Sequence, residues 1–112
     1  MIKNQIEWLV SLQDLDIMLQ ELDEVQKLGF EMHKEGKAKL EGARKELIEK
    51  INKPLVGMYE RLRARYKRAI VPVIDDTCSG CFMKLPTYLI TLAQRDKEVI
   101  SCEGCGRILY WL

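Results

Sequence analysis

Apolar side chains recur every three or four residues along the first quarter of the chain. The stripe consists of Leu9, Leu12, Leu15, Leu19, Leu22 and Val25. This period is that of one face of an α-helix, and acidic residues occupy the other faces. We therefore expect an amphipathic helix over about residues 3–28, which at ~1.5 Å per residue would be about 40 Å long.

A second stripe of the same period runs from about Lys37 to Arg68 or Ala69. It is formed by Leu40, Leu47, Ile51, Leu55, Met58 and Leu62. Pro54 lies inside this stripe. Because proline lacks a backbone N–H and clashes with the preceding turn, the helix is expected to kink or restart there. Pro54 would then stand in the first turn of the new segment, with Asn52 as its cap.

The two stripes predict an antiparallel helical (coiled-coil) hairpin over residues 1–69. Gly29 and Gly36 place the turn near 29–36, since glycine accepts the left-handed backbone that ends helices. Formal charge sums to −5 over residues 1–35, +7 over 36–70 and −1 over 71–112, which returns the net +1. An acidic arm beside a basic arm fits this pairing. A lone pair of helices buries little surface, so a homo-oligomer is one way to gain contacts.

The last third of the chain has the pattern of a small β domain, residues 70–112. Residues 69–74 are dominated by β-branched side chains and predict a strand, which Pro72 would place at a sheet edge. Pro86 is expected to open a short helix. Residues 98–101 and 107–111 are two further short strand candidates.

Two C-x2-C pairs in this domain predict one structural zinc ion, held by Cys78, Cys81, Cys102 and Cys105. Glycines in and after the pairs would ease the tight turns, and backbone N–H groups there would donate to the thiolates. Two disulfides, an iron centre and unliganded thiols are the alternatives. Four thiolates close the coordination shell, which leaves no open position for catalysis. We expect the hairpin to keep its helices without the ion.

Neither catalysis nor a membrane location is indicated. The chain has no phosphate-binding glycine loop and no visible nucleophile–base arrangement, which predicts that it is not an enzyme. The N-terminus lacks the apolar run of a signal peptide, and no stretch is long and apolar enough to span a bilayer. A cytoplasmic location is therefore expected, where cysteine pairs are more often metal ligands than disulfides.

Three motifs in the second half of the chain resemble a known family. Residues 59–63 read YERLR, residues 71–73 read VPV, and the cysteine pairs lie within C-x2-C-x-M-x-L-P and C-x2-C-G-R-I-L-Y. The combination is similar to the bacterial C4-type zinc-ribbon family with an N-terminal coiled-coil hairpin. The resemblance implies four cysteine ligands with Arg107 beside the second pair. It also implies a transcription-linked adaptor or nucleic-acid-binding role. The family's hairpin is usually longer than this one.

Two functions remain open at this stage. The first is an adaptor for a protein partner, with the transcription machinery suggested by the resemblance alone. Its candidate contact residues are Phe30, Met32, Phe82, Met83 and residues 110–112, with a place in the core as the alternative for most of them. The second is an RNA- or DNA-binding module that uses the basic end of the second helix and the ribbon. Its candidate residues are Arg61, Arg65, Arg68 and Arg107. The alternative is that these charges pair with the acidic helix or are merely solvated.

Overall fold

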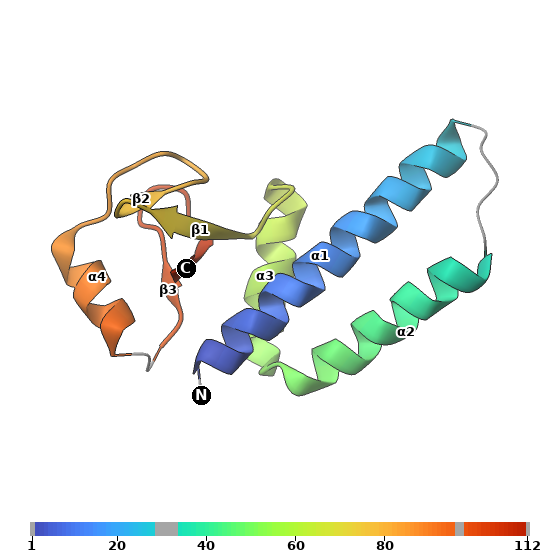
Figure 1. The fold of residues 1–112 in the computed structure, drawn as a ribbon, viewed down its shortest axis with the longest axis horizontal. Helices are drawn as coiled ribbons and strands as arrows, with labels where there is room; N and C mark the ends of the chain where they lie inside the picture. Colours follow the sequence, from blue (N-terminus) through green and yellow to red (C-terminus); the bar gives the residue numbers. More distant parts are fainter. Residues whose placement is uncertain (1, 29–33, 96–97, 112) are drawn as a thin grey trace.

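A computed structural model describes residues 2–28, 34–95 and 98–111 of the chain. Its elements are, in order, α1 (Ile2–Lys27), α2 (Lys34–Lys50), α3 (Lys53–Arg65), β1 (Ile70–Ile74), β2 (Thr77–Cys78), α4 (Thr87–Gln94), β3 (Ile100–Ser101) and β4 (Ile108–Trp111). The predicted fold class is confirmed, because a helical hairpin precedes a small sheet that carries the cysteines (Figure 1). The molecule measures 49 × 28 × 22 Å.

The hairpin is formed by α1 and α2, which lie antiparallel (Figure 1). The first helix follows its predicted bounds closely. The second begins at Lys34, so Gly36 lies inside a helix and not in the turn. The rest of the predicted turn, including the candidate contacts Phe30 and Met32, falls mostly on residues 29–33, outside the described residues.

The second arm is broken near Pro54, as its sequence predicts. Helix α3 starts at Lys53 with Pro54 in its first turn. Asn52 stands at the N-cap position, but its side chain makes no capping hydrogen bond. Gln5 of α1 satisfies the break instead: its Oε1 accepts from the Asn52 N–H at 2.8 Å and its Nε2 donates to the Lys50 carbonyl at 3.2 Å.

Helix α3 ends at Arg65, three residues before the earliest predicted end, Arg68. Tyr66 is extended, and its N–H makes the last helical bond, to the Leu62 carbonyl at 2.8 Å. The predicted extension of this helix to Arg68 is therefore wrong. That residue lies in the connection to β1, while Arg61 and Arg65 remain one turn apart on α3.

The sheet has the strand order β2-β1-β4-β3, with β1 and β4 parallel at its centre. Pro72 lies in β1, so its predicted edge position is wrong. The missing N–H is tolerated because the pairing of β1 with β2 begins only at Val73. The Pro72 carbonyl accepts hydrogen bonds from the N–H and the hydroxyl of Ser79, the residue after β2, at 3.3 and 2.7 Å. The expected helix after Pro86 and both later strands are confirmed as α4, β3 and β4.

The sheet separates two buried clusters. The cluster on the helical side combines Leu9, Leu12, Ile51, Tyr59, Leu62, Ala69, Ile70 and Ile108. The cluster within the ribbon combines Val71, Val73, Cys78, Leu85, Leu89, Ile100, Cys102 and Leu109. Successive residues of β1 and β4 thus point to opposite sides, as strand geometry requires. The first cluster crosses the boundary between residues 69 and 70 that the sequence pattern suggests for two domains.

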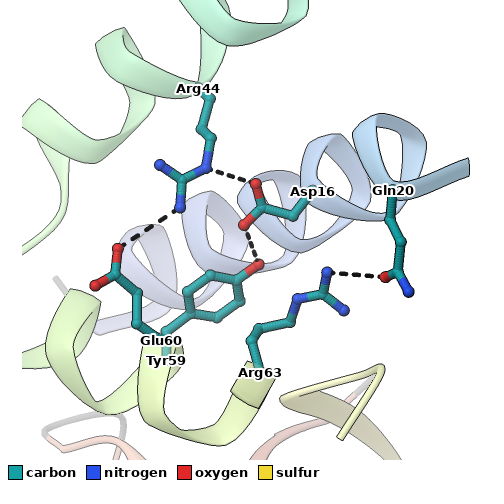
Figure 2. A network of polar contacts seen from close by, with 6 residues as sticks. All are labelled: Asp16, Gln20, Arg44, Tyr59, Glu60 and Arg63. Carbon is teal, nitrogen blue, oxygen red and sulfur yellow. Dashed lines mark hydrogen bonds and ion pairs between the residues drawn. The ribbon is translucent and has the colours of Figure 1, made fainter. Parts of the chain in front are cut away.

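Buried and partly buried polar contacts hold the helices against one another and against the sheet. Gln13 of α1, 2% exposed, accepts from the Ile70 N–H at 2.8 Å and donates to the Ile70 carbonyl at 3.0 Å. Figure 2 shows a second network, in which Asp16 accepts from Tyr59 Oη at 2.6 Å and from Arg44 Nε at 2.5 Å. Three helices therefore meet at one carboxylate.

Candidate metal centre

The four cysteine thiols come together at one point of the ribbon. Their Sγ atoms all lie within 4.8 Å of one another. The distance is 3.8 Å between Cys78 and Cys105 and 3.6 Å between Cys81 and Cys102. Sulfurs bound to one zinc ion at ~2.3 Å in a tetrahedron are about 3.8 Å apart, whereas a disulfide is ~2.05 Å long. The donor set fits one zinc ion, as predicted, and no disulfide is formed by these cysteines.

The two cysteine pairs have the same backbone hydrogen bonds. In each knuckle, the carbonyl of the first cysteine accepts from the residue four positions later, and its N–H donates to the carbonyl five positions later. The bonds are Phe82 N to Cys78 O and Gly106 N to Cys102 O, both 2.8 Å, Cys78 N to Met83 O, 3.0 Å, and Cys102 N to Arg107 O, 2.9 Å. Two copies of one local fold thus face each other across the metal position.

The fourth position after the first cysteine requires a left-handed backbone. Gly106 occupies it in the second knuckle with φ +82°, and Phe82 occupies it in the first with φ +63°. A bulky residue in this region is unfavourable by roughly 1–2 kcal/mol. The Phe82 side chain is also 78% exposed, so packing does little to offset the strain. Aligning the two knuckles in the sequence would have revealed this mismatch.

Burial and backbone donors act against each other on the thiols. Burial is the largest influence on Cys78 and raises its pKa to about 12, although the backbone at Cys81 and Gly80 acts in the other direction. Burial is also the largest single influence on Cys102 and acts to raise its pKa, but the backbone at Cys105 and Gly104 and the side chains of Cys81 and Cys105 together lower the pKa to about 7. The Gly104 N–H lies 3.4 Å from the Cys102 sulfur. These donors are placed to stabilise metal-bound thiolates.

Arg107 joins the metal centre to the end of α3. Its guanidinium carbon lies 3.8 Å from the centre of the Tyr66 ring, and the Tyr66 hydroxyl donates to the Cys105 carbonyl at 3.0 Å. A Cβ added at Gly80 would stand 2.3 Å from Arg107 Nη1. Gly80 therefore admits the guanidinium and, unlike Gly106, has no positive φ. The cation lies where it would partly offset the −2 charge of a zinc ion with four thiolates.

The other three candidate arginines belong to α3 and the segment that follows it. Arg61 and Arg65 are exposed on α3, and Arg68 is exposed beyond its end. Within the described residues, none of the three forms an ion pair. Arg65 has a looser contact with Tyr66, at 5.4 Å from the ring centre. The four candidate residues thus divide into Arg107, which packs in the ribbon, and an exposed basic group on and after α3.

Comparison with known families decides what this metal centre is. Residues 77–109 match the model of the C4-type zinc ribbon domain. The C-terminal part of the chain is a C4-type zinc ribbon. The match confirms the zinc-ribbon part of the resemblance seen in the motifs, and the four cysteines are positioned to bind one zinc ion.

Two solved structures are similar to most of this chain. CT398 from Chlamydia trachomatis is 32% identical, with a TM-score of 0.65. The HP0958 protein from Helicobacter pylori is 30% identical, with a TM-score of 0.64. Each similarity covers 80% of this chain and only 36% of the other protein. A search of curated proteins gave no match. Over the described residues, none of the helices has the length and apolar character needed to cross a membrane.

Proposed function

We propose that the protein is a non-enzymatic, cytoplasmic adaptor that presents a zinc ribbon to a protein partner. The closed set of four thiolates carries this proposal, because a catalytic zinc needs a position open to water or substrate. The metal then stabilises a domain too small to fold on its own core. The link to transcription comes from the family resemblance alone.

Exposed apolar side chains on the ribbon support a protein-binding role. Phe82, Met83, Tyr88 and Ile74 are all 46–78% exposed. Aromatic residues and methionine are enriched in protein interfaces. Phe82 combines its exposure with a strained backbone, and strain of this kind is often kept where a residue serves recognition.

The adaptor role can be tested by capture from a bacterial lysate treated with nuclease. We expect the zinc-loaded chain to retain a defined protein partner, and Phe82→Ser with Tyr88→Ser to lose it. A matched control is Met18→Ser with Leu28→Ser, which removes exposed apolar residues from α1 and the residue after it. Retention of the partner by the Phe82 and Tyr88 variant would contradict the proposed surface.

Nucleic-acid binding is the second candidate function, favoured by the exposed group of Arg61, Arg65 and Arg68. Phosphate contacts by such residues would make affinity fall with salt, with a slope of about −0.7 per neutralised phosphate on single strands. We expect Arg61→Glu with Arg65→Glu to abolish binding of single-stranded RNA or DNA, measured by fluorescence anisotropy. Lys39→Glu with Lys45→Glu makes the same change of charge on exposed positions of α2 and is the control. Equal binding by both variants would reject this role.

A further inference from the structure

A cleft of about 690 Å³ lies between the N-terminal half of α1 and the ribbon. One wall is α1, and the other is formed by β3, β4 and the end of α4. This volume is within the range of ligand-binding pockets, roughly 300–1,000 Å³. Neither the metal centre nor the basic group on α3 contributes to its lining.

The lining of this cleft is apolar on both walls. Ile6 and Val10 face it from α1, and Ile100, Leu109 and Trp111 face it from the sheet. Such a lining gains free energy when an apolar side chain displaces water from it, by roughly 25 cal/mol per Å² of apolar surface removed from water. The cleft is therefore suited to a bulky aliphatic or aromatic group.

The charged groups of the lining are all acidic. Glu7 stands on α1 and Glu98 stands just before β3, so the two carboxylates belong to opposite walls. Both residues are exposed. A cation at the mouth of the cleft would complement them, and complementary charges at the rim of a binding site favour association and specificity.

One further feature indicates a peptide as the occupant. Ile100 lines the same cleft and belongs to β3, the outer strand of the sheet. An extended peptide can add its backbone to such an edge strand while its side chains enter an adjacent pocket.

We propose that this cleft binds a short segment of another protein chain that carries a bulky apolar side chain next to a lysine or arginine. This inference rests on the proposed adaptor function and assigns it a second contact surface, distinct from the exposed residues around Phe82. The apolar side chain fills the space between α1 and the sheet, and the cation lies between Glu7 and Glu98.

The test is selection of random short peptides, displayed on phage, against the zinc-loaded full-length chain. We expect the retained peptides to place lysine or arginine beside leucine, isoleucine, phenylalanine or tryptophan. Synthetic copies should shift the amide resonances of Val10 and Ile100. Affinity should fall at least about tenfold in Glu7→Lys with Glu98→Lys, a change at exposed positions that leaves the core intact.

A matched control makes the same change of charge elsewhere. Glu41→Lys with Glu46→Lys alters two exposed residues of α2 that are absent from the lining, and it should bind the peptides as the wild type does. Retained peptides without basic residues, equal loss in both variants, or no retained peptide would each overturn the cleft proposal. If a lysate partner depends on Phe82 but not on Glu7 and Glu98, the cleft proposal fails while the adaptor function stands. If no lysate partner exists, the adaptor function fails whatever the peptides show.

Discussion

Phe82 and Gly106 occupy the same place in the two cysteine knuckles but differ in their fit to it. Both backbones are left-handed, with φ of +63° and +82°. Glycine adopts this conformation without steric penalty, whereas phenylalanine does not. The ribbon therefore holds an exposed aromatic residue in a strained backbone conformation, and a glycine would relieve this strain. The effect of Phe82 on stability can thus be measured separately from its proposed role in binding.

Phe82→Gly is expected to stabilise the zinc-loaded chain by up to ~1 kcal/mol, because the relief of strain exceeds the entropy that glycine adds to the unfolded state. Gly106→Ala should destabilise it by about 1 kcal/mol through backbone strain alone, since no atom lies within 4 Å of the added Cβ. Urea unfolding at saturating zinc measures both changes. The interpretation fails if Phe82→Gly destabilises the fold as much as Gly106→Ala does.

At the scale of single residues, the sequence predicts the metal ligands better than it predicts the contacts of other residues. The spacing of the cysteines is enough to identify a four-thiolate site, since the ligands of each pair are close in the chain. Arg107 was expected near the second pair, but its stacking on Tyr66 depends on where α3 ends. Gln13 was missed, because its partner Ile70 is 57 residues away and no local pattern marks a buried glutamine.

At the scale of elements, the long apolar stripes of the sequence predicted the helices correctly, whereas the end of the last helix of the second arm was predicted too late. The apolar period gave α1 within a residue of its observed bounds, and Pro54 marked the start of α3. The observed end of α3 is followed by Tyr66, which contacts the distant residues Cys105 and Arg107, and the central position of Pro72 depends on the pairing of β1 with β4. The partner strand β4 lies more than thirty residues further along, so local propensity could not place it.

The contact between α1 and β1 can be tested at Gln13. Its side-chain amide makes two hydrogen bonds to the backbone of Ile70, one to the N–H and one to the carbonyl. In Gln13→Leu the shape is nearly kept, but the N–H and the carbonyl of Ile70 lose their partners in a buried site. A buried unsatisfied group is unfavourable by about 1–3 kcal/mol, so we expect a loss of about 2 kcal/mol or more in the free energy of unfolding.

Gln20→Leu is the control for Gln13→Leu, since Gln20 is an exposed residue of the same helix that accepts one bond from Arg63. Its effect on urea unfolding should stay within about 0.5 kcal/mol. Similar losses of unfolding free energy in the two variants would show that the two hydrogen bonds to Ile70 stabilise the fold no more than the exposed bond of Gln20 does.

The contact between α1 and α3 predicts a dependence on pH. Burial, and then the hydrogen bond to Asp16, raise the pKa of Tyr59 well above its usual value near 10. The stabilisation from this bond is therefore complete below pH ~10 and declines above it, where the unfolded chain loses a proton that the folded chain keeps. Tyr59→Phe should lower stability by about 1.5–3 kcal/mol at pH 8, since the lost bond is to a carboxylate.

The difference in unfolding free energy between wild type and Tyr59→Phe should then narrow above pH 10, by up to ~1.4 kcal/mol per pH unit. Urea unfolding at intervals from pH 8 to about 11.5 measures it. Tyr88→Phe, at a half-exposed position, should show no such change. A difference that stays constant over this range would rule out Tyr59 as the titrating group.

At the scale of the whole molecule, the zinc ribbon and the helices share one buried cluster. Ile70 of β1 and Ile108 of β4 are at most 1% exposed, and they pack with Leu9, Leu12 and Tyr59 of the helices. The sequence pattern favoured a hairpin that stays helical without the ion. The shared cluster predicts a different outcome. If the sheet unfolds, Ile70 and Ile108 also leave the core that they share with the helices.

Removal of zinc is therefore expected to destabilise the helices together with the ribbon. In Cys102→Ser, one ligand is lost while the helical cluster keeps every side chain, so the effect on the helices must come through the sheet. We expect far-ultraviolet circular dichroism and tryptophan fluorescence to report one shared thermal transition, at a lower temperature than in the wild type. Added zinc should restore the wild-type transition in a chelator-treated wild-type chain but not in the variant. Helices that melt at the wild-type temperature in Cys102→Ser would show that the hairpin folds on its own and that the shared cluster contributes little to its stability.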